Sequence, residues 1–172
     1  MKINLQDLIL NIKNIKVGQE VLLSGSIYTA RDASHKRIIA ILDNDGDLPV
    51  NLRNSAIYYC GPTPSRPGGI VGSCGPTTSS RMDVYTPRLL KEGVKILIGK
   101  GARSESVVES LKGNSALYLV ATGGIGALIS KTVKRSEILA FEDLGPEAIY
   151  RFEVENMPLI VAIDSFGNNI FK

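Results

Sequence analysis

The stretch from Gly75 to Arg81, which reads Gly-Pro-Thr-Thr-Ser-Ser-Arg, carries side chains suited to binding an anion. A Ser or Thr here would cap a following helix, whose free backbone N–H groups and dipole attract negative charge. Arg81 would then fall in the first helical turn, where a cation is disfavoured unless an external anion lies beside it. A carboxylate suits the planar fork of arginine, so the pattern indicates a carboxylate site. The alternative is a surface arginine paired with a local acid.

A second polar cluster spans residues 31–37 and reads Arg-Asp-Ala-Ser-His-Lys-Arg. It contains His35, the one histidine of the chain. Because His35 follows Arg31 by four residues, the two would share one face of a helix. An imidazole that titrates near neutral pH can transfer protons. The alternative is a helix capped near Asp32 with a solvated basic face.

Lys100 lies between two glycines, directly after the apolar run from Val94 to Ile98. In parallel α/β sheets, ligands bind beyond the carboxyl ends of the strands, so Lys100 is a candidate binding residue. The segment lacks the Ser or Thr after the lysine and the upstream glycine of a phosphate-binding loop. The stretch from Gly123 to Gly126 follows a strand pattern, but it lacks the third glycine of the dinucleotide fingerprint. A nucleotide site is therefore disfavoured.

The composition excludes several classes of protein. Lys and Arg total 20 against 17 Asp and Glu, a formal charge of +3 without a long basic run, so no nucleic-acid partner is expected. No apolar stretch reaches the roughly 20 residues of a membrane helix, and no signal-peptide pattern is present. We therefore predict a cytoplasmic chain without membrane association. Hydrophobic residues make up 44% of the 172, which excludes disorder and suits one domain over residues 1–172.

The chain has two cysteines, Cys60 and Cys74. Two thiols cannot supply the usual four ligands of an iron–sulfur cluster or a structural zinc ion, so we expect no metal on this chain. Both cysteines adjoin glycine-rich loops, where packing is the expected role of a small apolar side chain. A reduced intracellular protein fits this usage, and one disulfide is the alternative.

The elements that must position these residues follow from hydrophobic periodicity and turn residues. We expect strands at 21–29, 56–60, 94–98 and 116–121, and helices at 5–15, 32–42, 81–92, 104–111 and just after Gly126. Short strands are expected in the tail at 138–141, 151–154, 159–163 and 168–171. Strands and helices alternate in the middle of the chain. This pattern predicts an α/β fold with a mixed, partly parallel sheet and right-handed crossovers.

Taken together, these motifs resemble the β subunit, or C-terminal catalytic domain, of class I iron–sulfur fumarate hydratase and the related L(+)-tartrate dehydratase. The motifs that match in order are residues 29–37, 58–62, 72–83, 98–101, 121–124, 143–149 and 164–168. The resemblance covers nearly the whole chain from about Val17. It implies a swivelling β/β/α fold. It also implies the reversible addition of water across the double bond of a dicarboxylate.

The resemblance also implies roles for individual residues. Arg31, Arg81 and Lys100 would clamp the carboxylates of the substrate, as suits a desolvated dianion. Thr77 would contact the reacting end of the substrate and assist proton transfer or departure of the hydroxyl group. His35 would be an active-site histidine, either as an acid or base or as a residue that orients Arg31 and Asp32.

The expected partner is an α subunit that carries the [4Fe–4S] cluster and the base acting on carbon. The family suggests an α2β2 assembly, and isolated β chains could form a homodimer. Fumarate is the expected substrate, with L-tartrate as the alternative diacid. An alternative from another class is a non-catalytic module that binds an anionic metabolite through the same arginines and lysine.

Overall fold

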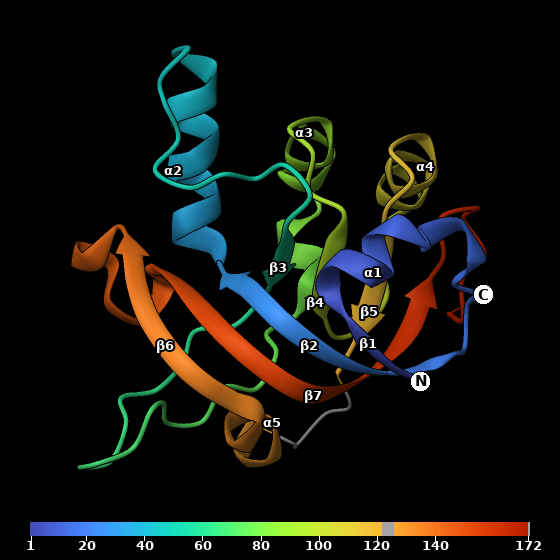
Figure 1. The fold of residues 1–172 in the computed structure, drawn as a ribbon. Helices are drawn as coiled ribbons and strands as arrows, with labels where there is room; N and C mark the ends of the chain where they lie inside the picture. The colour runs from blue at the N-terminus through green and yellow to red at the C-terminus, as the bar shows by residue number, and fades with distance from the viewer. Residues whose placement is uncertain (122–125, 172) are drawn as a thin grey trace.

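The computed structural model describes residues 1–121 and 126–171, which form a seven-stranded sheet in the order β1-β2-β3-β4-β5-β7-β6 (Figure 1). The strands are β1 (Lys2–Asn4), β2 (Glu20–Thr29), β3 (Ala56–Tyr58), β4 (Ile96–Gly99), β5 (Leu117–Val120), β6 (Val133–Ala140) and β7 (Ile149–Ile163). Strands β1 to β5 are parallel to their neighbours, and β7 is antiparallel to β2, β5 and β6. The predicted mixed, partly parallel sheet is confirmed.

The long strand β7 closes the sheet onto itself. It pairs with β5 through Tyr118↔Ile163 and with β2 along most of its length, from Glu20↔Ile160 to Thr29↔Tyr150. Strand pairing therefore runs in a closed circuit through β2, β3, β4, β5 and β7. A closed circuit leaves few unpaired strand edges, so the carboxyl ends of the parallel strands are held firmly relative to one another.

Helices cover both sides of the strands. They are α1 (Leu5–Leu10), α2 (Asp32–Asp43), α3 (Thr86–Lys91), α4 (Glu105–Gly113) and α5 (Gly126–Thr132), with short 3-10 turns η1 (Ile12–Asn14), η2 (Ser79–Met82) and η3 (Glu142–Glu147). Helices α2, α3 and α4 stand side by side on one side of the sheet in Figure 1. No helix among the described residues combines the length and the apolar character needed to cross a membrane.

The core consists of two apolar clusters separated by the strands. Successive strand residues point to opposite faces, so Ala56 and Tyr58 join one cluster while Ile57 and Tyr59 join the other. The first cluster includes Leu5 and Leu8 of α1 and Ile129 of α5. The second includes residues of α2, α3 and α4, namely Ile38, Leu89, Leu90, Val107, Val108 and Leu111. The parallel strands β3, β4 and β5 are buried on both faces, as their continuous apolar runs predict.

Several element boundaries differ from the sequence prediction. The expected helix over 81–92 is divided into η2 and α3. Pro87 lies in the first turn of α3, because proline has no N–H to donate within a helix and favours its start. Similarly, the helix expected over 5–15 consists of α1 and the separate turn η1, and β1 lies before it.

The tail differs as well. The strands expected at 151–154 and 159–163 form one continuous strand, β7, which absorbs extra residues opposite β2 in a bulge where Asn156 has a φ of 53°. Of the strand expected at 138–141, residues 138–140 are part of β6, and Phe141 lies outside it with a φ of 59°. The segment 168–171 is not a strand and makes a single bridge, from Asn169 to Ile163. The glycine stretch from Gly123 to Gly126 falls, except for its last residue, outside the described residues.

Candidate active site

The candidate site lies where three neighbouring parallel strands end. Arg31 follows the end of β2 by two residues, and Lys100 follows β4 directly. Thr77 is held beside the end of β3, because its backbone N–H donates to the carbonyl oxygen of Tyr59 at 2.7 Å. Strands β2, β3 and β4 are adjacent and parallel, so their carboxyl ends meet at one edge of the sheet. The sheet therefore brings Arg31, Thr77 and Lys100 to the same edge, as expected of a ligand site.

Arg81 connects two parts of this edge. Its NH2 group donates to Asp32 Oδ2 at 2.9 Å and to Thr77 Oγ1 at 3.2 Å. The same Asp32 oxygen lies 3.9 Å from NH2 of Arg31. Two guanidinium groups thus face one carboxylate. About half of the Arg81 side chain is exposed, 48%, so a solute can reach it.

Arg31 packs against the loop after β3. A Cβ atom added to Gly61 would lie 2.9 Å from Arg31 Cδ and 3.1 Å from NH1, so a glycine is required for this approach. The Nε atom of Arg31 is buried without a hydrogen bond within the described residues, and it lies 3.8 Å from Glu147 Oε1. Glu147 was not predicted as a site residue, although it belongs to the 143–149 motif.

The first turn of α2 holds Arg31 from the main-chain side. Its N–H donates to Ser34 Oγ at 3.0 Å, and Ser34 Oγ lies 3.1 Å from the Arg31 carbonyl oxygen. The ring of His35 also contacts that carbonyl, with Nδ1 at 2.7 Å. Because a carbonyl oxygen can only accept, Nδ1 carries the proton and donates, which leaves Nε2 unprotonated in the neutral ring.

His35 is fully buried, and its ring lies against the rings of Tyr59 and Tyr85. Burial disfavours the imidazolium and lowers the pKa of His35 to about 4. Its Nε2 atom has no hydrogen-bond partner among the described residues. This setting favours the orienting role over the acid or base role, because the ring supports Arg31 from inside the protein.

The predicted anion-binding helix start is wrong. The residues after Thr77 form the short turn η2, and Thr78 at its start makes no side-chain cap bond. The N–H groups of Thr77 and Ser79 are already used, by Tyr59 O and by Lys100 O at 3.3 Å. Pro87 directs helix formation to a later point in the chain, so this segment contributes no helix start to the site. The helix that begins at the site is α2, whose first residue is Asp32. Arg81 instead pairs with Asp32, the local acid of the alternative interpretation.

Lys100 lines a cleft of about 520 Å³ next to these residues. The cleft is lined by Gly61, Thr63, Ser73, Gly75, Pro76, Lys100, Gly126 and Ala127. Gly61 connects the cleft to Arg31, whose side chain lies on that glycine. The Lys100 side chain is exposed and makes no ion pair within residues 1–121 and 126–171. The cleft therefore presents the ammonium group of Lys100, and the Arg31 side chain packs against Gly61 in its wall.

The residues of this chain do not fit an iron–sulfur cluster. Cys60 and Cys74 are buried, free thiols, and the described residues contain no group of three or more metal-ligating side chains. A hydrogen bond with Cys74 and burial raise the pKa of Cys60, which keeps it from becoming the thiolate that a metal requires. Both cysteine side chains are fully buried, as the packing role expected for them requires.

The assembled site can bind a small dianion and present a hydroxyl group to it. Three cationic side chains come from separate connections, and Thr77 accepts a hydrogen bond from Arg81, which leaves its own proton available for donation. Arg103 and Asp83 form a buried ion pair beside Tyr59 and were not singled out from the sequence. Asp83 closes the Arg-Met-Asp part of the 72–83 motif, but nothing in the sequence indicates its partner.

Comparison with known proteins gives consistent matches. The family model described as the fumarase C-terminus matches residues 1–172. A putative L(+)-tartrate dehydratase subunit beta from Methanocaldococcus jannaschii is 39% identical over 94% of this chain and 86% of that protein. Fumarate hydratase 2 of Leishmania major is 38% identical over 91% of this chain, and the aerobic class I fumarate hydratase of Escherichia coli K12 is 33% identical over 98%. The chain matches only 28% and 31% of the lengths of these two hydratases.

Proposed function

The chain belongs to the fumarase C-terminus family, and from that premise we propose that it is the β-type part of a hydro-lyase that interconverts fumarate and L-malate by reversible hydration. One observation carries the proposal. Arg31 and Arg81, which come from different connections, face a single carboxylate group, that of Asp32. Such a pair is suited to the carboxylate of a small diacid.

Asp32 occupies part of the space that one substrate carboxylate would take. Because the Asp32 carboxylate is about two-fifths exposed, water and solutes can compete for the same guanidinium groups. A substrate carboxylate would replace or share the Asp32 contact with Arg81 and keep both arginines neutralised. The substrate would thus compete with Asp32 for the two guanidinium groups, and each arginine would exchange one charged partner for another.

Lys100 would bind the second carboxylate. It lines the same cleft as Gly61, against which the Arg31 side chain packs, and it lies on the connection that follows β4. A fumarate or malate dianion has its two carboxylates at opposite ends of a four-carbon chain. Cations placed at both ends would orient the substrate and leave its central carbons next to Thr77.

Thr77 would act at the reacting end of the substrate. Its hydroxyl oxygen accepts a hydrogen bond from Arg81, so its proton is free to be donated to a departing hydroxyl group. His35 would hold the Arg31 carbonyl in place and keep the guanidinium in register with Arg81. In this assignment Thr77 is the catalytic residue of the chain, and His35 is a positioning residue.

A partner chain would complete the active site. The family is iron–sulfur dependent, and this chain lacks the thiols for a cluster, so we propose that an α subunit carries the [4Fe–4S] cluster and the base acting on carbon. An α2β2 assembly is part of the proposal. So is the swivelling β/β/α arrangement of one domain over residues 1–172, which the shared strands of the two core clusters support.

L-tartrate is the second candidate substrate. The relative that this chain matches over most of its length is a putative tartrate dehydratase subunit. Both substrates are four-carbon diacids, so the same three cations would suit either. A non-catalytic anion-binding module is the alternative of another class, and it would use the cations without the hydroxyl of Thr77.

The test is the activity of the chain co-expressed anaerobically with an α-type subunit of a class I hydro-lyase. Loss or gain of fumarate would be followed by the ultraviolet absorbance of its double bond in assays with fumarate and L-malate. A parallel assay with L-tartrate would follow the oxaloacetate that the loss of water from tartrate forms. Turnover of fumarate is the expected result. Turnover of tartrate alone would change the substrate but keep the reaction class, and no turnover by a complex with an intact cluster would contradict the hydro-lyase.

A further inference from the structure

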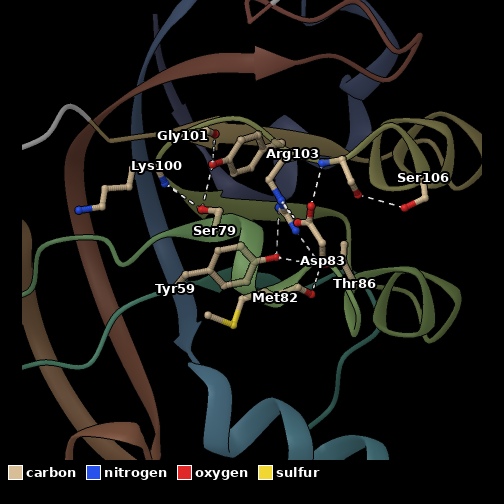
Figure 2. Close-up of polar contacts among 11 residues, drawn as sticks. Tyr59, Ser79, Met82, Asp83, Thr86, Lys100, Gly101, Arg103 and Ser106 are labelled. Atoms are coloured by element: carbon tan, nitrogen blue, oxygen red, sulfur yellow. Dashed lines mark hydrogen bonds and ion pairs between the residues drawn. The ribbon is translucent and has the colours of Figure 1, made fainter.

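We propose that Arg103 and Tyr118 are positioning residues that set the spacing between Arg81 and Lys100. These two cations and Arg31 form the proposed carboxylate-binding set, which we call the clamp. This inference rests on the proposed function of the clamp. Arg103 has a buried side chain, which Figure 2 shows beside Asp83 and Thr86, and Tyr118 belongs to the buried strand β5. Neither side chain would contact the substrate.

Arg103 has a side chain that is completely buried, and its donors have partners in several directions. Its Nε donates to Asp83 Oδ1 at 2.6 Å and its NH2 to Thr86 Oγ1 at 2.7 Å. Its guanidinium carbon lies 5.2 Å from the ring centre of Tyr59 and 4.9 Å from that of Tyr118. A buried charge is costly unless it is paired and hydrogen-bonded, and here both conditions are met. The geometry of the ion pair is therefore strongly restricted.

Asp83 transmits this restriction to Arg81. It follows η2 directly and lies two residues after Arg81. One of its carboxylate oxygens accepts from Arg103, and the other accepts from the N–H of Ser104 at 2.7 Å. The end of η2 is thereby tied to the connection between β4 and α4, on which Lys100 also lies. The Arg103–Asp83 ion pair therefore fixes the end of η2 relative to the connection that carries Lys100.

Tyr118 fixes the position of the Lys100 backbone relative to the start of η2. The N–H of Lys100 donates to Ser79 Oγ at 2.9 Å. The Tyr118 hydroxyl lies 2.9 Å from both Ser79 Oγ and the Gly101 carbonyl oxygen. Because the carbonyl can only accept, the phenol donates to Gly101 and receives the proton of Ser79. Burial raises the pKa of Tyr118, so its hydroxyl keeps the proton that this chain of bonds requires.

The two connections meet at η2. Ser79 is its first residue and is bonded to Lys100, while Asp83 follows its last residue and is bonded to Arg103. Gly99 permits the close approach, because a Cβ atom there would collide with the Ser79 hydroxyl. Figure 2 shows the Lys100 side chain extending away from the network while its backbone is held by it. A rigid base with a projecting ammonium group is the arrangement expected of a positioned ligand contact.

The first test measures whether the network orders the Lys100 segment. Amide hydrogen exchange would be followed in the assembled complex for peptides that contain Lys100 and Gly101. The variant Tyr118→Phe removes the hydroxyl and keeps the ring against Arg103. We expect the exchange of these amides to become about tenfold faster, since the loss of one buried hydrogen bond weakens local protection by roughly that factor.

The matched control is Tyr150→Phe, which also removes a hydroxyl bonded to a backbone carbonyl, that of Gly145 at 3.2 Å. This control leaves the Lys100 segment untouched, so its exchange there should equal that of the wild type. Unchanged exchange in Tyr118→Phe would overturn the proposal without any reference to activity. Arg103→Met is more disruptive, because it removes a buried charge. Its exchange is interpreted only if a thermal denaturation measurement shows that the variant folds.

The second test is a double-mutant cycle with Lys100→Ala. We expect Tyr118→Phe to raise KM for the diacid about fivefold in the wild-type background and to have no further effect when Lys100 is alanine. Equal effects in both backgrounds would show that Tyr118 does not act through Lys100 and would overturn the inference. A wild-type complex that turns over no diacid would instead refute the proposed function, and that outcome is distinct because it involves no variant.

Discussion

Arg81 donates a hydrogen bond of 2.9 Å to Asp32, which joins the turn η2 to the first turn of α2. The two residues are 49 positions apart in the chain. Arg31 faces the same Asp32 oxygen at 3.9 Å. In the proposed function, the carboxylate of Asp32 therefore competes with a carboxylate of the diacid for the two arginines. Removal of the Asp32 charge distinguishes this competition from a role of Asp32 in orienting Arg81.

Asp32→Asn is expected to tighten binding of a diacid. The amide keeps the shape of the carboxylate but removes its charge, so the two arginines attract an external dianion more strongly. We expect the inhibition constant of a non-reactive diacid such as succinate to fall about threefold to tenfold, in keeping with about 1 kcal/mol for a half-exposed ion pair. Competitive inhibition kinetics of the complex would measure it. Weaker binding would mean that Asp32 chiefly orients Arg81.

Arg81→Ala is expected to weaken substrate binding. Removal of one guanidinium leaves a carboxylate of the substrate without its partner, which costs about 2–5 kcal/mol in comparable charged contacts. We expect kcat/KM to fall at least thirtyfold, with much of the loss in KM. The matched control is Arg88→Ala, an exposed arginine of α3 that pairs with Glu92. Equal kinetics for Arg81→Ala and the wild type would exclude Arg81 from the site.

Thr77→Val tests the hydroxyl group as a proton donor. Valine preserves the branched shape and removes the oxygen that lies 3.2 Å from Arg81. Loss of a general acid typically lowers the rate about 10²–10⁴-fold, so kcat should fall by that order while KM changes little. Thr77→Ser retains the hydroxyl and should restore most of the activity. If Val and Ser variants were equally active, Thr77 would have no part in proton transfer.

The burial of His35 predicts that the free energy of unfolding falls in acid. Its pKa is about 4 in the folded chain against an ordinary value of 6.5, because burial disfavours the charged ring. The unfolded chain therefore binds a proton that the folded chain does not between these two values. The free energy of unfolding should fall by about 3 kcal/mol as the pH is lowered from 6.5 to 4. Urea unfolding of the isolated chain at several pH values would measure this slope.

The control for that experiment is His35→Asn, which can still donate to the Arg31 carbonyl but does not titrate. It should show a much flatter profile over the same interval, although its overall stability is lower because the ring contacts are lost. Asp143 does not confuse the measurement, since its hydrogen bond with Arg37 lowers its pKa and moves its titration below this interval. An equally steep profile in His35→Asn would refute the assignment.

Much of the site's location could be predicted from the sequence. Apolar strand runs that alternate with helices indicate a parallel sheet, and Lys100 at the end of such a run belongs at its carboxyl edge. The Asp32–Arg81 pair could not be predicted, because it depends on how η2 and α2 approach in three dimensions. The burial of His35 likewise depends on Tyr59 and Tyr85, which come from distant segments.

Other differences between the sequence prediction and the structure can be traced to particular residues. Pro87 is a signal that the helix after Arg81 must begin late, and it explains why the segment from Thr77 to Arg81 does not start an α-helix at the site. Arg103 stands in a polar stretch before α4 and resembles an ordinary surface residue. Only the arrangement of Asp83, Tyr59 and Tyr118 around it reveals a buried cation, and such long-range pairing leaves no periodic pattern in the chain.

The openness of the clamp has a consequence for assembly. With the Arg81 side chain about half exposed, water screens its attraction for a dianion, so the chain alone should hold its ligand weakly. A partner surface that covers the clamp would expel that water and strengthen every charged contact. Thermodynamic reciprocity then requires the ligand to strengthen the association of the two chains by the same factor. A diacid would thus act as a stabiliser of the quaternary structure, and its depletion would favour dissociation.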